Sequence, residues 1–182
     1  LFPYTTLFRS AKLDACMELV HGALDGGHHI LLFSQFTGML DIIGKRLAKE
    51  DIGFLKLTGA SSKESRAKMV AQFQAGEVPV FLISLKAGGV GLNLTAADVV
   101  IHYDPWWNVA AQDQATDRAH RIGQQHTVTV YKLIAKDTIE ERIMQMQESK
   151  RDLVNSVLGG DGISSALFTR EDVLALLGGD GR

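Results

Sequence analysis

Short and nearly continuous apolar runs alternate with stretches of helical periodicity, and this alternation is the feature that most restricts the fold. The runs are HILLFSQF, GFLKLTG, VPVFLISL, DVVIHYD and VTVYKLIA, at residues 29–36, 53–59, 78–85, 98–104 and 128–135. Runs of this length that lack a polar alternation are typical of strands buried on both faces. Strands that alternate with helices predict an α/β fold, with a mostly parallel sheet and helices on both faces.

The predicted helices lie between these strands. Leu13, Cys16, Met17, Val20 and Leu24 recur at helical spacing, and Gly26-Gly27 ends that helix. Further helices are predicted around residues 39–47, from a capping box of Ser61 and Glu64 to Phe73, over 108–120, and from a capping box of Thr138 and Glu141 to about residue 158. In residues 159–182, the segment GGDGISS predicts a linker and TREDVLALL predicts a short helix.

Composition narrows the class of protein. The net charge of −2 excludes a basic surface over the whole protein, although it permits a few local contacts with nucleic acid. The single cysteine, Cys16, excludes an internal disulfide and a multi-cysteine zinc site. The histidines show no metal-binding spacing, and no apolar run approaches the length of a membrane span. We therefore expect no metal site in the chain, no membrane partner and a cytoplasmic location.

The first ten residues, LFPYTTLFRS, match no predicted element. They resemble the translation of a common sequencing-library adapter, and the alternative is an ordinary N-terminal strand. We expect residues 1–10 to be a non-native, adapter-derived segment. The native gene would then be interrupted at residue 11.

Two loops that follow predicted strands could bind a ligand. SLKAGGVGLNL (84–94) carries Gly88, Gly89 and Gly91, whose backbone amides could approach an anion, although such turns are as often structural. YDPWWN (103–108) carries adjacent tryptophans that point opposite ways in an extended segment, one available for stacking on a base or both structural. The chain contains no G-K-[ST] sequence, so it lacks a Walker A phosphate loop.

The segment DRAHRIGQ (117–124) carries two arginines three residues apart, and the question is which negative group they bind. On a continuous helix, Gln114, Arg118 and Arg121 share one face. Arginine presents a planar fork of donors that suits phosphate oxygens. The alternative is a surface arginine pair bonded to Asp113 or Asp117. Because the chain has no phosphate loop of its own, we favour arginine fingers that complete an ATP site on another lobe.

Several ordered motifs resemble one family. LLFSQFTGMLDII, LTGASSKESR, SLKAGGVGLNLTAADVVIHYDPWWN, DQATDRAHRIGQ and VTVYKLIAKDTIEERI resemble the C-terminal RecA-like lobe of the Swi/Snf family of DNA-dependent ATPases, within superfamily-two helicases. The resemblance covers residues 11–158, with residues 138–158 similar to the family's brace helix. It implies a RecA-like fold and a second motor lobe that closes on ATP and Mg²⁺ held by an N-terminal lobe.

The resemblance also implies residue roles. Arg118 and Arg121 would stabilise charge on the γ-phosphate, and nucleotide contacts would come from Gly89, Gly91 and Gln114. Contacts with double-stranded DNA would come from Ser34, Gln35, Gly59, Ser61, Lys86, Gly88 and Trp107. Val109 stands where many eukaryotic members have proline, which favours a bacterial, nucleoid-associated member over one that acts on nucleosomes.

Other functions remain possible. The fragment alone would be an inactive nucleic-acid-binding module without ATPase activity, and an upstream Walker loop in the intact gene distinguishes the two interpretations. A DEAD-box-like RNA helicase lobe would resemble HRIGRxGR, whereas residues 120–126 read HRIGQQH. An ordinary dinucleotide-binding enzyme lacks support because no G-x-G-x-x-G follows a strand.

Overall fold

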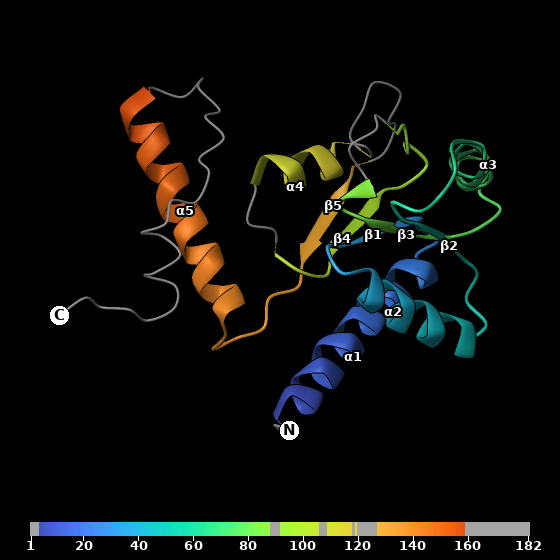
Figure 1. Cartoon of the computed structure of the whole chain (residues 1–182), viewed down its shortest axis with the longest axis horizontal. Coiled ribbons are helices and arrows are strands. Elements are labelled where there is room, and N and C mark those ends of the chain that lie inside the picture. The colour runs from blue at the N-terminus through green and yellow to red at the C-terminus, as the bar shows by residue number, and fades with distance from the viewer. Residues whose placement is uncertain (1–3, 88–91, 106–108, 118, 120–126, 159–182) are drawn as a thin grey trace.

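A five-stranded parallel sheet forms the centre of the protein (Figure 1). The computed structural model describes residues 4–87, 92–105, 109–117, 119 and 127–158. The strand order is β2-β3-β1-β4-β5, and every pairing between neighbouring strands is parallel. The strands are β1 (Ile30–Ser34), β2 (Phe54–Leu57), β3 (Val80–Ser84), β4 (Val99–His102) and β5 (Thr129–Lys132). All five strands coincide with the predicted apolar runs, which confirms the predicted sheet.

Helices cover both faces of the sheet, as predicted (Figure 1). Helices α1 (Tyr4–Asp25) and α2 (Thr37–Lys49) pack on one face, against Ile30, Leu32 and Leu82 among others. Helices α3 (Lys63–Gln74) and α4 (Val109–Thr116) pack on the other face, where Phe33, Phe73 and Phe81 are fully buried. Alternate residues of β1, β3 and β4 therefore enter two separate cores, as the two-residue period of a strand requires.

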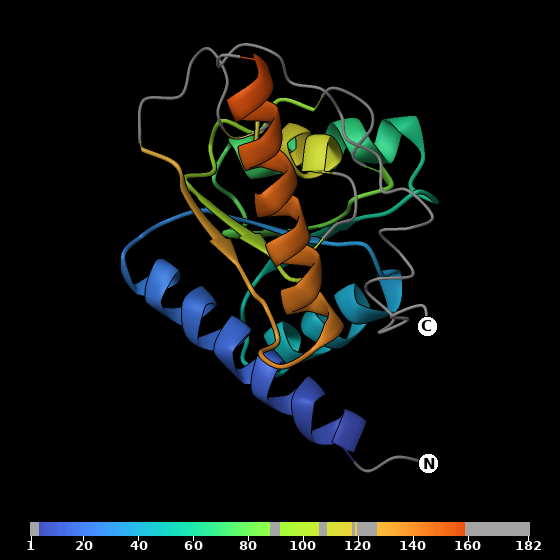
Figure 2. The same cartoon turned by 90° about the vertical axis from the view of Figure 1, so that its left-hand side faces the viewer.

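The last helix lies beyond the β5 edge of the sheet (Figures 1 and 2). Helix α5 (Ile139–Leu158) begins at the predicted capping box, where Thr138 Oγ1 accepts a hydrogen bond from Glu140 N–H at 3.2 Å. The Glu141 carboxylate accepts from Asp137 N–H at 2.8 Å.

Every residue of β5 is exposed, so the expectation of a strand covered on both faces is wrong for this edge strand.

Three predicted boundaries need correction. Helix α1 begins at Tyr4, so the expectation that the first ten residues match no element is wrong from residue 4 onward. Helix α3 is capped by Ser62, whose side chain accepts from Ser65 N–H, and not by Ser61. Helix α4 ends at Thr116, whereas the sequence predicted a helix to residue 120. The predicted linker and terminal helix at 159–182 lie outside the described residues.

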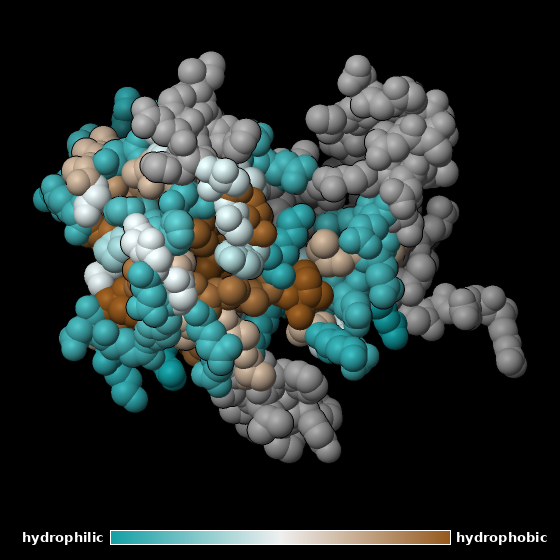
Figure 3. Space-filling view, turned by 180° about the vertical axis from the view of Figure 1, so that it is seen from behind, coloured by the Kyte–Doolittle hydropathy of each residue, from teal (hydrophilic) through white to brown (hydrophobic). Residues whose placement is uncertain are grey.

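Some large apolar side chains remain at the surface. Figure 3 shows apolar residues gathered in the middle of one face and surrounded by hydrophilic ones. The exposed large hydrophobic residues of the described chain are Phe36, Ile42, Val130, Tyr131 and Ile139. No helix in the described part of the chain combines the length and the apolar character that crossing a membrane requires.

Candidate functional site at the carboxyl edge of the sheet

The loops after β1, β3 and β4 meet at one edge of the sheet. Ser34 lies opposite Ser84 in the register of β1 and β3, and Phe33 lies opposite His102 in β4. Leu85 N–H donates to the Ser34 carbonyl oxygen at 3.0 Å, and Tyr103 N–H donates to that of Phe33 at 2.9 Å. In parallel α/β sheets, ligands bind outside this edge. The structure thus brings the predicted Ser34–Gln35 loop beside the segment that carries Lys86, whose side chain is exposed.

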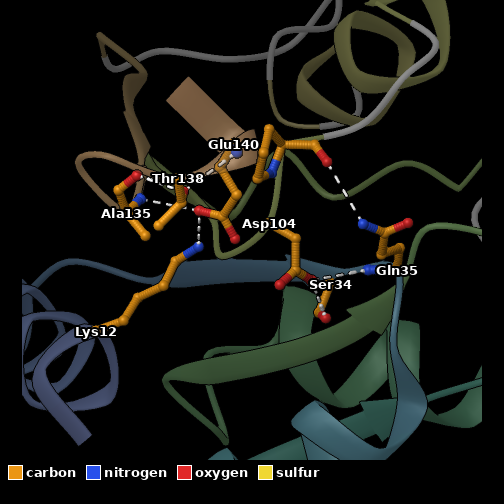
Figure 4. A network of polar contacts seen from close by, with 8 residues as sticks. Lys12, Ser34, Gln35, Asp104, Ala135, Thr138 and Glu140 are labelled. Atoms are coloured by element: carbon orange, nitrogen blue, oxygen red, sulfur yellow. Dashed lines mark hydrogen bonds and ion pairs between the residues drawn. The ribbon is translucent and has the colours of Figure 1, made fainter. Parts of the chain in front are cut away.

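A buried carboxylate fastens the loop after β1 to the loop after β4 (Figure 4). Asp104 is 6% exposed. Its Oδ2 accepts the Ser34 hydroxyl and, at 3.2 Å, the Gln35 N–H. The Gln35 amide nitrogen donates in turn to the Pro105 carbonyl oxygen at 3.5 Å. Burial raises the pKa of Asp104, while the Ser34 hydrogen bond and the charge of Lys12 oppose that rise. Asp104 therefore fixes the relative position of two loops.

A second polar contact anchors the start of α5 (Figure 4). Lys12 Nζ of α1 lies 2.5 Å from Glu140 Oε2, and the two side chains are 12% and 24% exposed. The same Glu140 oxygen accepts from Ala135 N–H at 2.9 Å. Lys12 Nζ also lies 5.1 Å from the ring centroid of Tyr103, a favourable arrangement for a cation over an aromatic face. The contact links α1, the end of β4 and α5.

The loop after β2 has its own internal support. Thr58 N–H donates to Ser61 Oγ at 3.1 Å, and Arg66 Nε donates to the Ser61 carbonyl at 3.0 Å. Arg66 also reaches the carbonyl oxygens of Thr58 and Gly59, both at 3.4 Å. Gly59 is exposed, and a Cβ placed on it would meet no atom within 4 Å. Gly59 and Ser61 thus lie in the loop after β2, a strand that β3 separates from β1.

Helix α4 leads from the β4 loop toward the predicted arginines. Gln114 is exposed on it, and Ala115 is buried in the core. After Thr116 the chain turns, because Ala119 N–H donates to the Thr116 carbonyl at 3.0 Å while Asp117 N–H still donates to Asp113. Arg118 and Arg121 lie outside the described residues, so the predicted shared face of Gln114 and both arginines stays a prediction.

A buried histidine connects β4 to the end of α4. His102 is 1% exposed, and its ring stacks on Phe33 at a centroid distance of 5.4 Å. Its Nε2 lies 3.0 Å from Thr116 Oγ1, within hydrogen-bonding distance. Burial, with the nearby charge of Lys132, lowers the pKa of His102 to about 4, so the ring is neutral at pH 7.

Sequence reasoning missed several residues of this edge. His102 had a usable signal, because a polar residue inside the apolar run DVVIHYD is expected to be buried and bonded. Asp104, Lys12, Glu140 and Arg66 act through partners far along the chain or through backbone groups, and nothing in the local sequence pointed to them. Six predicted site residues lie outside the described residues: Gly88, Gly89, Gly91, Trp107, Arg118 and Arg121. Within the described ranges, no three His, Cys, Asp or Glu residues are placed to hold a metal ion.

The sheet order, the two helical layers and the loops at the carboxyl edge define a RecA-like lobe. The family model "Helicase conserved C-terminal domain" matches residues 11–123. The chain belongs to this family, and its relatives are Swi/Snf-type ATP-dependent helicases.

The relatives and solved structures agree on this assignment. An uncharacterized ATP-dependent helicase of Mycoplasma pneumoniae is 46% identical over 171 residues, which are 93% of this chain and 17% of that protein. The C-terminal part of the Fun30 ATPase domain has a TM-score of 0.71 and 40% identity, over 74% of this chain and 44% of that one. The Sulfolobus solfataricus SWI2/SNF2 ATPase core in complex with dsDNA has a TM-score of 0.68 and 40% identity, over 81% and 31%. The chain thus spans less than a fifth of the length of the Mycoplasma relative.

Proposed function

We propose that the chain is the second motor lobe of an ATP-dependent translocase of double-stranded DNA. The observation that carries the proposal is the placement of the loops. The Ser34–Gln35 loop, the Lys86 segment and the loop that leads into α4 lie at one edge of the sheet. The SWI2/SNF2 ATPase core at 40% identity was solved in complex with dsDNA, which supports DNA as the partner.

The DNA-facing groups are proposed from exposure as well as from resemblance. Lys86 and Gly59 are exposed, so both can meet a phosphate backbone. Ser34 is fully buried and bonded to Asp104, so its proposed part is to shape the loop that presents Gln35. Ser61 supports the Gly59 turn through the Thr58 N–H. Gly88 and Trp107 complete the proposed DNA-contacting set.

The nucleotide would meet this lobe beside α4. Gln114 is exposed and therefore available, and Gly89, Gly91, Arg118 and Arg121 are the other proposed contacts. Bound ATP supplies a γ-phosphoryl group for transfer to water, and the guanidinium groups of Arg118 and Arg121 would neutralise the charge that develops there. The absence of a G-K-[ST] sequence supports a phosphate cradle on an N-terminal lobe. We place Mg²⁺ on that lobe too, together with the phosphates.

Two consequences follow from a divided ATP site. The 182 residues alone would hydrolyse ATP negligibly, because the lobe that holds the phosphates is not encoded in them. Closing and opening of the two lobes would move the motor along one strand of duplex DNA.

We propose that residues 11–158 are the lobe with its brace helix and that residues 1–10 are adapter-derived. We also propose that the intact protein is a cytoplasmic, nucleoid-associated bacterial protein.

The test is to recover the uninterrupted gene and to measure ATPase activity with and without duplex DNA. We expect strong stimulation by duplex and a loss of roughly 10³-fold or more in kcat for Arg118→Ala and Arg121→Ala, with weaker effects on ATP binding. Arg46→Ala is the matched control, because it removes an arginine that pairs with Glu50 on the outer side of α2. Turnover like that of the wild type in both arginine variants would refute the arginine assignment.

The same assay distinguishes the translocase from the alternative function, a nucleic-acid-binding module without ATPase activity. If the intact gene begins near residue 11 and its product binds duplex DNA without hydrolysing ATP, the protein is a stand-alone binding module. Lys86→Ala should then weaken DNA binding. In a translocase, it should weaken the coupling of ATPase to DNA more than it weakens the affinity for ATP.

A further inference from the structure

The chain between His102 and Thr116 forms a loop that is closed at its base. It leaves the sheet at the end of β4 and ends with α4, and its sequence includes Trp106 and Trp107. The contact between His102 Nε2 and Thr116 Oγ1, at 3.0 Å, joins the first residue of this loop to its last. Arg118 follows two residues later. In the sequence, the two contacting residues flank the predicted DNA loop, and Thr116 lies two residues before the first predicted arginine.

The histidine side of the contact is held rigidly. His102 is paired in register with Phe33 of the central strand β1, and their rings stack with an interplanar angle of 19°. The ring is buried at the carboxyl end of β4, with 1% of its surface exposed. Thr116 is the last residue of α4, where the helix gives way to the Ala119 turn. The sheet can thus fix the end of α4 through a single side chain.

Stability alone does not explain a histidine at this position. Its Nδ1 is buried and has no hydrogen-bond partner in the described part of the chain. A buried ring nitrogen without a partner destabilises a fold, and a phenylalanine would fill the same space and keep the stack on Phe33 without that penalty. The polar ring therefore serves its contact with Thr116 at the expense of stability.

We propose that His102 is a positioning residue for the motor reaction. Through Thr116 it sets where α4 ends. It thereby sets the starting point of the segment that carries Arg118 and Arg121. The task of those arginines rests on the proposed function, whereas the geometry of the His102–Thr116 contact does not. Loss of the contact should loosen the backbone at Asp117 and Ala119, in the segment that leads to the arginines, and leave both cores intact.

Matched substitutions can isolate the contact in the intact protein. His102→Gln can place an amide nitrogen near the position of Nε2, whereas the shorter His102→Asn cannot reach Thr116. His102→Phe keeps the ring, and Thr116→Val against Thr116→Ser repeats the comparison from the other side. We expect His102→Asn, His102→Phe and Thr116→Val to lower the kcat of DNA-stimulated ATPase roughly tenfold to a hundredfold, with the KM for ATP little changed. His102→Gln and Thr116→Ser should restore most of the activity, and the double variant His102→Phe/Thr116→Val should lose no more than either single variant.

A second readout does not depend on ATPase activity. The amides of Asp117 and Ala119 donate to Asp113 and Thr116, so their hydrogen exchange reports the order of the turn. In the intact protein, exchange in the peptide 113–119 should quicken in His102→Phe and Thr116→Val, with β1 unchanged and with the Tm of His102→Phe equal to or above that of the wild type. Unchanged exchange at 113–119, or a fall in Tm that parallels the fall in kcat, would overturn the proposal. If the wild type lacks DNA-stimulated ATPase, the proposed function fails, and the exchange experiment still decides whether His102 positions the turn.

Discussion

Asp104 offers the sharpest test of how the edge loops are held, because removing its carboxylate and removing its charge should have different effects. Both of its hydrogen bonds end on the same oxygen, Oδ2, which accepts from the Ser34 hydroxyl and from the Gln35 N–H. Asp104→Ala removes this acceptor. The Ser34 hydroxyl can turn to the Phe36 carbonyl oxygen, which lies 3.3 Å away, whereas the Gln35 N–H is left without an acceptor.

The size of the effect follows from that difference. Leaving the part-buried Gln35 N–H unsatisfied, where a charged acceptor stood before, costs about 2–3 kcal/mol. Asp104→Asn can place its amide oxygen where Oδ2 stood, keep both hydrogen bonds and avoid burying a charge. We therefore expect Asp104→Ala to lower the free energy of unfolding by about 2–3 kcal/mol and Asp104→Asn to leave it equal or raise it. Urea denaturation at pH 7 measures both values.

The pH dependence supplies an independent check. Because burial raises the pKa of Asp104 in the folded protein, the folded state binds a proton there more readily than the unfolded state does. The wild type should therefore gain stability relative to Asp104→Asn as the pH falls through the raised pKa, and any advantage of the asparagine variant should shrink. Equal losses in Asp104→Ala and Asp104→Asn would refute the reasoning, because they would show that the charge, and not the shared acceptor, holds the loops.

Three further predictions concern other buried groups. The pKa of His102 is lowered from 6.5 to about 4, so protonating the ring is harder in the folded state than in the unfolded state. The free energy of unfolding should therefore fall by about 3 kcal/mol as the pH falls from 6.5 toward 4. Urea denaturation of His102→Phe should lack this pH dependence. The Cys16 thiol is buried and its pKa is raised to about 12, so alkylation by iodoacetamide at pH 8 should be on the order of a thousandfold slower than for a free thiol, and a rate near that of a model thiol would contradict its burial. A Cβ on Gly44 would lie 3.0 Å from ring carbons of Phe54, so Gly44→Ala should lower the free energy of unfolding by about 1–2 kcal/mol, while Gly38→Ala, in the same helix with nothing within 4 Å, should not lower it.

The order of elements could be predicted because buried parallel strands carry their burial in the local sequence. The runs around Leu32, Leu82 and Val100 are apolar on both faces, and the structure buries both faces of these strands. The run around Val130 is also apolar, yet β5 is an edge strand and is exposed. Local hydropathy does not encode the position of a strand within the sheet, which depends on pairing partners tens of residues away.

Exact helix ends were harder to predict, because neighbouring side chains compete for the same role. Ser61 and Ser62 are both competent N-caps. The cap is Ser62 because the Ser61 hydroxyl already accepts a hydrogen bond from the Thr58 N–H. The end of α4 depends in the same way on a turn that local propensity does not reveal. The candidate site was predictable as a set of loops, whereas the burial of Asp104 depends on Ser34, seventy residues earlier in the chain.

The central position of β1 has a consequence for synthesis on the ribosome. Ile30 pairs with Val80 on one side and with Val99 on the other, so about 70 residues must be added before the second partner strand exists. At 5–20 residues per second this interval lasts roughly 4–14 s, and throughout it the fully apolar segment Ile30–Phe33 has no completed sheet around it. Helices α1 and α2 are made before β3 and can cover one face of β1 during this time. The other face is covered only by α3 and α4. The nascent chain therefore exposes an apolar surface until residues beyond Thr116 have emerged.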